Sequence, residues 1–268
     1  MDSPHKLSYR LGHFGVRVAG ILIYVFLALP VLVIVLSAFS PEPYPQFPPQ
    51  GVSLRWFSAL LQDAGWIESL WISALLLVIV TPVTVMLGTG AAWALARVDF
   101  RYRQVLQAFI LSPLMIPQVV LGIALLYVLT ATGIAGMVSG LVIGHVVVAL
   151  PYVVRTVSVS LMAMDQRLEA VAMSLGAGRW YSFLHVTLPL IKPGILAGAV
   201  FAAVTSFGEV SVSLFLSAPD TITVPVRVFN YVDQTFDPTV NAISVVFIAV
   251  AVLILVVIEK TIGLVKLN

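Results

Sequence analysis

The chain has 268 residues, of which 60% are hydrophobic and only 10% are charged, and its formal net charge is +2. Soluble domains carry about 25% charged residues, so this composition excludes an ordinary soluble domain and indicates a membrane protein. The small net charge, with no cluster of Lys and Arg, argues against nucleic acid as a partner. The absence of cysteine excludes disulfides, thiolate zinc sites and thiol redox chemistry.

Apolar runs long enough to cross a bilayer recur along the whole chain. A hydrocarbon core about 30 Å thick takes about 20 apolar residues as a helix. The sequence therefore predicts an all-α membrane protein with six transmembrane helices in one domain, at residues 18–39, 69–96, 105–130, 137–154, 186–216 and 239–258. The first run exceeds a signal-peptide core of roughly 7–15 residues, which predicts an uncleaved anchor. The second and fifth runs are longer than a bilayer needs and are expected to tilt, kink or extend into water.

Prolines and polar side chains mark features between and within these spans. Residues 40–50 hold five prolines and precede an aromatic stretch, which predicts an extended segment that leads into a short interfacial helix. Pro113 and Pro117 predict a kink in the third span, where Gln118 either uses freed carbonyl groups or faces a pathway. In the fourth span, His145 is expected to form interhelical hydrogen bonds, with a proton relay as the alternative.

Basic residues alternate between the gaps, and this pattern orients the chain. Most basic residues lie in four segments: the two tails, the gap after the second span and the loop of residues 155–185. These residues are Lys6, Arg10, Arg17, Arg97, Arg101, Arg103, Arg155, Arg167, Arg179, Lys260 and Lys266. The other gaps hold Arg55 and Arg227 among acidic residues. The positive-inside rule places both termini and the 155–185 loop in the cytoplasm.

The 155–185 loop has the pattern of a helix, a glycine turn and a second helix. Apolar residues at 3- and 4-residue steps predict an amphipathic helix at about residues 158–175. Gly176 and Gly178 follow and are expected to end it in an exposed turn, because glycine adopts left-handed conformations. A second short helix is expected from Trp180, and Pro189 marks the entry to the fifth span. Such a loop either holds a partner or lies in the lipid headgroups as a connector.

Glu209 is the main polar group within the fifth span. On a continuous helix it shares a face with Thr205, Ser206 and Ser213. A carboxylate in hydrocarbon is costly and usually faces an interior or a water path, so Glu209 is a candidate contact for a cationic substrate. In the alternative, the span ends early and Glu209 lies at the external interface or pairs with Arg227.

The loop resembles the cytoplasmic "EAA" loop of the inner-membrane permeases of ABC importers. That pattern is Glu-Ala-Ala, three residues, Gly, nine residues and Ile-x-Leu-Pro; here nine residues separate Gly176 from Val186-Thr187-Leu188-Pro189. The first half departs from it, since Ala170-Val171-Ala172 occupies the Glu-Ala-Ala register and Glu169 stands one position early. The resemblance implies an ATPase-coupling site made of Glu169, Ala170, Ala172, Gly176, Ala177, Gly178, Leu188 and Pro189.

The resemblance extends over nearly the whole chain. Six stretches are similar to one subgroup, the second permeases of spermidine/putrescine importers and their relatives for opines, 4-aminobutyrate-like amines or aminophosphonates. They are residues 51–57, 95–97, 112–122, 206–210, 225–228 and 241–244. It implies a type I importer permease fold over residues 1–268 in a bacterial inner membrane, and passage of a small amine-bearing solute such as a polyamine. The substrate-pathway candidates are Glu209, Thr205, Ser206, Ser213 and Gln118.

The resemblance also implies the partners. These are a pair of cytoplasmic ATP-binding subunits on the loop, a second permease subunit and an external solute-binding protein. The chain lacks G-x-x-x-x-G-K-[ST], so ATP is expected to act through another subunit and no cofactor is expected here. No catalytic or metal-binding spacing is present, which argues against an enzyme. An autonomous secondary transporter or channel that uses Glu209 and His145 is the alternative, and an intramembrane enzyme or scaffold is a third hypothesis.

Overall fold

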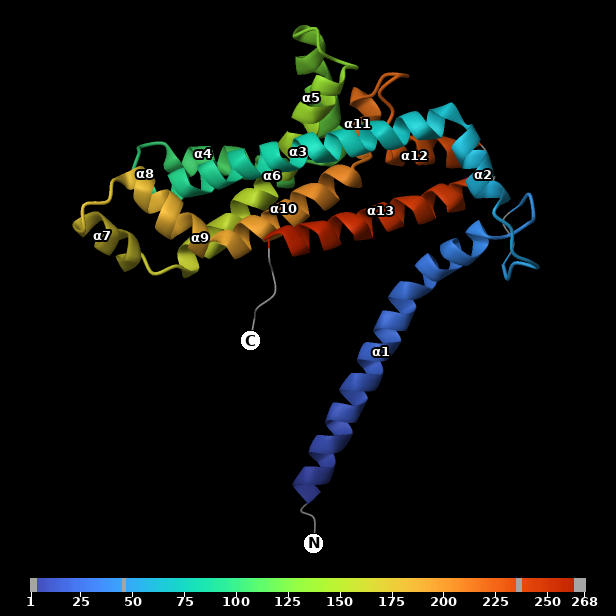
Figure 1. Ribbon diagram of the computed structural model, residues 1–268, viewed down its shortest axis with the longest axis horizontal. Coiled ribbons are helices and arrows are strands. Elements are labelled where there is room, and N and C mark those ends of the chain that lie inside the picture. Colours follow the sequence, from blue (N-terminus) through green and yellow to red (C-terminus); the bar gives the residue numbers. More distant parts are fainter. Residues whose placement is uncertain (1–3, 45–46, 235–237, 263–268) are drawn as a thin grey trace. The chain divides into compact units, whose positions relative to one another are not determined.

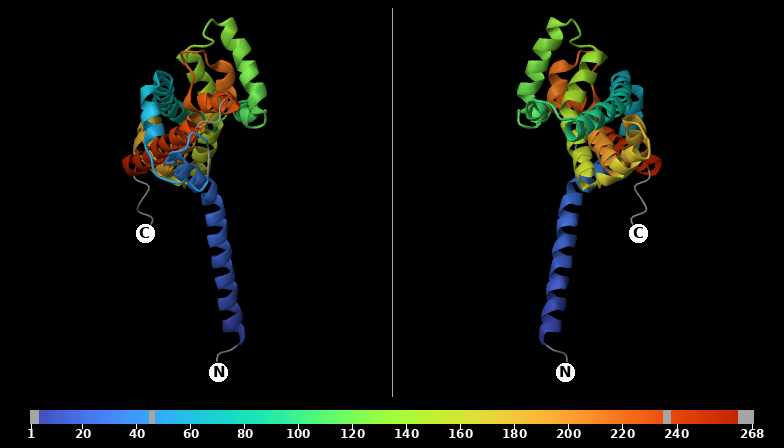
Figure 2. Two further views of the ribbon diagram at one scale, coloured as in Figure 1. Left: turned by 90° about the vertical axis from the view of Figure 1, so that its right-hand side faces the viewer. Right: turned by 90° about the vertical axis from the view of Figure 1, so that its left-hand side faces the viewer.

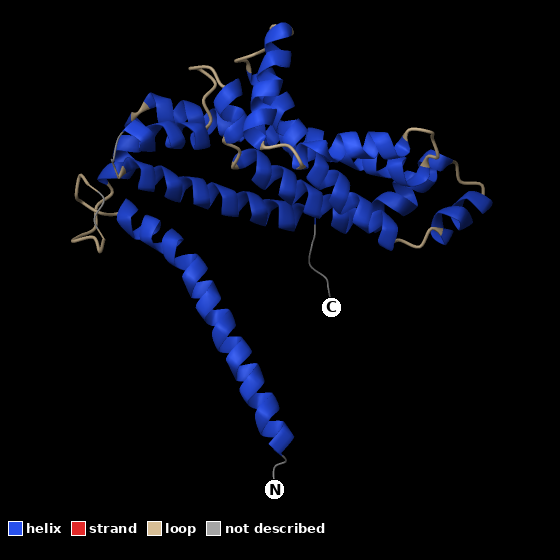
Figure 3. Cartoon of the chain, turned by 180° about the vertical axis from the view of Figure 1, so that it is seen from behind, coloured by secondary structure: helices blue, strands red, loops and turns tan. Residues whose placement is uncertain are grey.

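The computed structural model describes residues 4–44, 47–234 and 238–262, and every regular element in these ranges is a helix (Figure 3). The predicted all-α membrane fold is thus confirmed. Within the described residues, four helices are long and apolar enough to cross a membrane, or up to six if each of two bent helix pairs counts as one span. The prediction of six spans agrees with the upper count. The chain divides into two compact units, residues 1–63 with 234–248 and residues 64–233 with 249–268.

The first unit holds the N-terminal helix and the proline-rich gap. Helix α1 (Pro4–Ala38) contains a candidate span over Gly15–Ala38, and α2 (Arg55–Gln62) is the predicted short helix after the gap. Trp56 anchors α2, because its indole Nε1 donates a hydrogen bond of 2.8 Å to the carbonyl oxygen of Ser40. The last helix, α13 (Thr239–Ile262), begins in this unit. Predictions that concern residues 1–3, 45–46, 235–237 and 263–268 lie outside the described residues.

The second unit is built on three helices that pack on one another, α3, α6 and α10, which run side by side in Figure 1. Shorter helices surround them, and α5 packs against α11 (Figure 2). The helices in chain order are α3 (Ala64–Arg97), α4 (Arg103–Leu111), the 3₁₀ turn η1 (Ser112–Leu114), α5 (Gln118–Ala131), α6 (Val138–Ala163), α7 (Arg167–Ser174), α8 (Arg179–Ser182), the π-helix η2 (Phe183–Thr187), α9 (Leu188–Leu190), α10 (Lys192–Phe207), α11 (Ser211–Leu216) and α12 (Val224–Gln234).

Glycines allow the three central helices to approach closely. A Cβ atom added to Gly88 of α3 would lie 2.6 Å from Cγ1 of Val153 in α6. One added to Gly198 of α10 would lie 2.9 Å from Oγ1 of Thr156 in α6, and one added to Gly194 would lie 2.8 Å from the carbonyl oxygen of Thr156. Gly194 and Gly198 are four residues apart, the small-residue spacing that lets membrane helices pack backbone to backbone.

The predicted third span, residues 105–130, is not one straight helix. Its two halves meet at an angle of 110°, between Leu114 and Gln118 (Figure 1). Pro117 accounts for the break, because it lacks an N–H and its extended ψ of 129° directs the chain into α5. The kink that the two prolines predict is confirmed, but it is far sharper than a bend within a helix.

The predicted fifth span, residues 186–216, is wrong in its extent. A bend of 71° at Ile191 separates Arg179–Leu190 from α10, and α10 ends at Phe207. Gly208 then caps α10, and α11 starts at Ser211 as a separate helix. Proline contributes to the bend, since Pro193 at the start of α10 has no N–H to continue the preceding helix.

The helix boundaries before the glycine turn also differ from the prediction. The fourth span does not end at Val154, because α6 continues to Ala163 and includes Arg155. The single helix expected over residues 158–175 is therefore wrong, and α6 and α7 are separated at residues 164–166. Asp165 explains the break: its Oδ1 accepts a hydrogen bond of 2.9 Å from the amide of Arg167, a local bond that competes with helix.

Candidate functional site

A left-handed glycine ends helix α7. Gly176 has φ +91°, a conformation that favours glycine, whereas Gly178 has an ordinary φ of −69° and precedes α8. The amide of Ala177 donates to the carbonyl oxygen of Ala172 (3.1 Å), and the amide of Gly176 to that of Met173 (3.1 Å). These two bonds form a Schellman motif, which satisfies carbonyl groups at a helix end. The predicted glycine turn is confirmed, but Gly176 alone requires glycine.

Apolar side chains surround this turn and are exposed on the surface of the isolated chain. Leu175 is 83% exposed and Trp180 is 70% exposed. A groove of about 480 Å³ beside the turn is lined by Ala172, Leu175, Gly176, Ala177, Gly178 and Tyr181. A Cβ added to either glycine of the turn would meet nothing within 4 Å. An exposed apolar patch on a helical hairpin is typical of a surface that docks on another protein.

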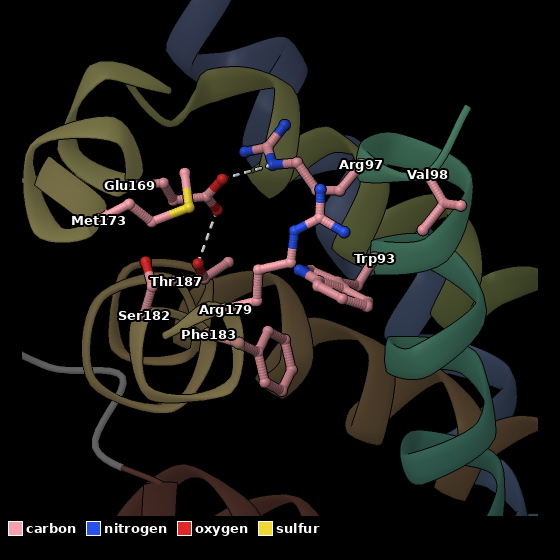
Figure 4. Close-up of a pocket in the computed structure, with 9 residues that line it drawn as sticks. All are labelled: Trp93, Arg97, Val98, Glu169, Met173, Arg179, Ser182, Phe183 and Thr187. Atoms are coloured by element: carbon pink, nitrogen blue, oxygen red, sulfur yellow. Dashed lines mark hydrogen bonds and ion pairs between the residues drawn. The ribbon is translucent and has the colours of Figure 1, made fainter. Parts of the chain in front are cut away.

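Glu169 joins three helices behind the turn. Its Oε2 accepts a hydrogen bond of 2.8 Å from Nε of Arg97 at the end of α3, and its Oε1 accepts one of 2.6 Å from Oγ1 of Thr187 in η2 (Figure 4). The side chains of Arg97 and Glu169 are each only 15% exposed, so this ion pair is largely shielded from water. We call Arg97, Glu169 and Thr187 the latch, because together they connect α3, α7 and η2.

The other predicted coupling residues do not all gather at the turn. Ala170 and Ala172 lie in α7, with Ala170 exposed and Ala172 half-buried at the groove. Leu188 and Pro189 lie in α9, the short helix just before the bend at Ile191. The two halves of the sequence pattern therefore mark two places, the exposed turn and the start of the bend.

A buried polar cluster lies between α6, α10 and α11. His145 is 1% exposed, and its Nδ1 and Nε2 lie 2.9 Å and 2.8 Å from the hydroxyls of Ser206 and Ser213. The interhelical hydrogen bonds expected for His145 are confirmed. No local signal in the sequence indicates its partners, which are 61 and 68 residues away.

Glu209 caps a helix at the edge of this cluster. Its carboxylate accepts hydrogen bonds from the amides of Val212 (2.9 Å) and Ser213 (2.8 Å), and the side chain is 5% exposed. A carboxylate just before a helix can satisfy free amide groups of its first turn and complements the helix dipole. Arg227 contacts other groups, since its Nε donates to Oγ of Ser69 over 2.9 Å.

The single helical face expected for the substrate-pathway candidates is wrong. Since α10 ends at Phe207, Ser206 and Ser213 lie on different helices, although both reach His145. Thr205 is half-buried near the end of α10, and Gln118 is exposed at the first position of α5. The structure therefore brings Ser206, Ser213 and Glu209 together but leaves Gln118 on another helix.

Comparison with known proteins decides the family. Residues 84–262 match the family described as "Binding-protein-dependent transport system inner membrane component". The chain belongs to this family. The matched range includes the glycine turn, the latch and the buried polar cluster.

Three similar proteins are permeases named for amine-bearing solutes. The chain is 26% identical over 234 residues to the spermidine/putrescine transport system permease protein PotC of Escherichia coli K12, covering 87% of this chain and 88% of PotC. It is 30% identical over 229 residues to the putrescine transport system permease protein PotI of the same strain, covering 82% and 81%. It is 28% identical over 245 residues to the putative 2-aminoethylphosphonate transport system permease protein PhnV of Salmonella typhimurium, covering 91% and 92%.

The fold agrees with this assignment. A crystal structure of a bacterial ABC transporter involved in the import of the acidic polysaccharide alginate matches with a TM-score of 0.78 at 17% identity, covering 97% of this chain and 98% of that chain. The chain is thus a membrane permease subunit of an ABC importer and not an enzyme. This family implies an ATP-binding subunit and a substrate-binding protein as partners.

Proposed function

We propose that this permease couples to its cytoplasmic ATP-binding subunits through the turn at Gly176 and forms half of the pathway for a small amine-bearing solute such as a polyamine. The observation that carries the coupling proposal is the turn itself. A left-handed glycine, φ +91°, presents an exposed apolar surface with open space around it. A Cβ at that φ is unfavourable, so a tight turn of this kind depends on glycine.

The latch supports a mechanical role for the turn. ATP is hydrolysed by the partner subunits, and their closure would move α7 and α8. Because Glu169 bonds to Arg97 and Thr187, a force on α7 reaches the end of α3 and η2 directly. The spans would then rock as rigid bodies and expose the pathway to alternate sides of the membrane.

Three relatives support an amine-bearing solute, since the permeases named for spermidine/putrescine, putrescine and 2-aminoethylphosphonate match this chain over 88%, 81% and 92% of their own length. The external solute-binding protein of this importer captures the cargo and offers the direct experiment. Calorimetric titration of that protein with spermidine, putrescine, 2-aminoethylphosphonate and a neutral sugar should show binding of at least one amine. Binding of the sugar alone would contradict the proposal for the solute and leave the coupling proposal intact.

Glu209 is proposed to contribute to solute passage. Its carboxylate lies beside the hydroxyl-bearing cluster of Ser206 and Ser213, where a cationic amine would find a counter-charge and acceptors. Glu209→Gln keeps the shape and removes the charge. Solute uptake in liposomes is expected to fall about tenfold, because a loss of roughly 1.4 kcal/mol of charge interaction corresponds to a factor of ten. The affinity of the separate binding protein for the solute should not change.

The control for this prediction is Glu68→Gln, which removes an exposed carboxylate outside the cluster. In Glu209→Gln the amide oxygen can still accept one of the two backbone hydrogen bonds, so the amount of folded protein in the membrane is measured for both variants. Unchanged uptake by Glu209→Gln at normal protein levels would leave Glu209 as a helix cap alone.

The proposed topology places both termini and the glycine turn in the cytoplasm, within one permease domain that packs beside a second permease subunit. The chain has no cysteine, so single cysteines are unique reporters. Cysteines at Ser3 and Asn268, which lie outside the described residues, should resist an impermeant thiol reagent in intact cells. Thr132→Cys, an exposed position between α5 and α6, should react. Labelling at either terminus would overturn the orientation.

A further inference from the structure

A positively charged pocket lies beside the latch. It has a volume of about 140 Å³, and α3, α7, α8 and η2 contribute its walls (Figure 4). Trp93 and Phe183 form an aromatic side, with ring centroids 5.1 Å apart. The residues that line the pocket are Trp93, Arg97, Val98, Glu169, Met173, Arg179, Ser182, Phe183 and Thr187.

Charge within this pocket is unbalanced. The guanidinium groups of Arg97 and Arg179 both point into it (Figure 4), and Glu169 is the single acidic residue among its lining side chains. That carboxylate is already engaged by Arg97 and Thr187. Two cationic groups therefore share one anionic group, and the pocket has a net positive charge at neutral pH.

Two residues that line the pocket carry a polar atom with no hydrogen-bond partner among the described residues. These atoms are Nη2 of Arg97 and Oγ of Ser182, and both are buried. Ser182 is 3% exposed, so its hydroxyl lies deep in the wall. Buried polar atoms in folded proteins are almost always satisfied by protein, water or a ligand. A ligand that accepts hydrogen bonds and carries negative charge would pair with these polar atoms and also balance the positive charge of the pocket.

We propose that this pocket binds a phosphate group, held by Arg97, Arg179 and Ser182. Phosphate has several acceptor oxygens, and guanidinium groups bind it with paired, charge-assisted hydrogen bonds. The volume of about 140 Å³ suits one phosphate group. Its source is either free inorganic phosphate or the headgroup of an anionic phospholipid, and basic pockets between membrane helices at the cytoplasmic side bind such headgroups. The bound group would bridge α3 and α8.

Equilibrium dialysis of the purified full-length chain against labelled inorganic phosphate tests the first source. Saturable binding is expected, weakened about tenfold or more by Arg179→Gln, which removes a charge-assisted bond. Ser182→Ala should weaken it less, since it removes one neutral donor. The matched control is Arg101→Gln, which removes an exposed arginine outside the pocket and should bind as the unchanged chain does.

Native mass spectrometry of the chain released from phosphatidylglycerol nanodiscs tests the second source. The unchanged chain should retain bound lipid, and the Arg179→Gln variant should not. Saturable binding in either assay with this dependence on Arg179 supports the proposal and names the source. Absence of binding in both assays, or binding that Arg179→Gln and Ser182→Ala leave unchanged, would overturn it. An acidic side chain of the ATP-binding subunit as the occupant would give that same negative result. Neither assay involves the ATP-binding subunits, so failure here leaves the coupling proposal untouched.

Discussion

Gly176→Asp is expected to abolish association of the permease with its ATP-binding subunits while the chain still inserts into the membrane. The left-handed backbone at φ +91° costs a residue with a Cβ about 1–2 kcal/mol. The carboxylate would in addition enter the apolar surface that we propose for docking, where an unpaired charge is strongly unfavourable. Co-purification of the ATP-binding subunit with affinity-tagged permease, without cross-linker, measures the effect.

Two alanine variants separate backbone strain from surface chemistry. Gly176→Ala should weaken association about tenfold, because a cost of about 1.4 kcal/mol corresponds to a factor of roughly ten. Gly178→Ala should weaken association less, since Gly178 has φ −69° and an added Cβ meets nothing within 4 Å in this chain. Equal behaviour of these two variants, or normal co-purification of Gly176→Asp, would remove the argument that the turn is the docking point.

Glu169→Ala is expected to reduce the solute imported per ATP hydrolysed by about tenfold or more. Loss of one partner from a buried ion pair costs about 3–5 kcal/mol, and the guanidinium of Arg97 would remain largely buried without its carboxylate. Helix α7 would then move with the ATPase but transmit less of its motion to α3. Uptake and ATP hydrolysis measured together in proteoliposomes give the ratio.

Further variants distinguish the latch from a local effect on α7. Thr187→Val removes one neutral hydrogen bond, worth about 1 kcal/mol, and should give a smaller loss. The double variant Arg97→Glu with Glu169→Arg exchanges the two charges and should recover part of the solute imported per ATP hydrolysed. Asp165→Asn, an exposed carboxylate in the same loop that caps α7 locally, is the control and should couple normally. An unchanged ratio in Glu169→Ala would assign Glu169 no part in transmission.

Features that depend on local chemistry were predictable from the sequence. Composition predicts a membrane-spanning helical chain, Pro117 predicts the break in the third span, and Gly176 predicts the turn. Each of these follows from a property of one residue or of a short run. The spacing of Gly194 and Gly198 is a usable signal of the same kind for close helix packing.

Features that depend on tertiary contacts were not predictable. Arg97 and Glu169 are 72 residues apart, and the position of Glu169 relative to the "EAA" pattern gives no indication of its partners. The helical face expected around Glu209 required a continuous helix to Leu216, and the end of α10 at Phe207 removes it. The break between α6 and α7 depends on a local hydrogen bond from the amide of Arg167 to Oδ1 of Asp165, which hydropathy alone does not report.

Site-specific cross-linking from the turn shows whether the ATP-binding subunit lies against Gly176 in the assembled importer. In this cysteine-free chain, Ala177→Cys carries a single short photoreactive thiol reagent next to Gly176. In membranes that contain the assembled importer, irradiation should join this position to the ATP-binding subunit, whereas the same reagent at Thr132→Cys should not react with that subunit. An assembled importer with no cross-link from Ala177→Cys, or with equal cross-linking from both positions, would contradict docking through the turn.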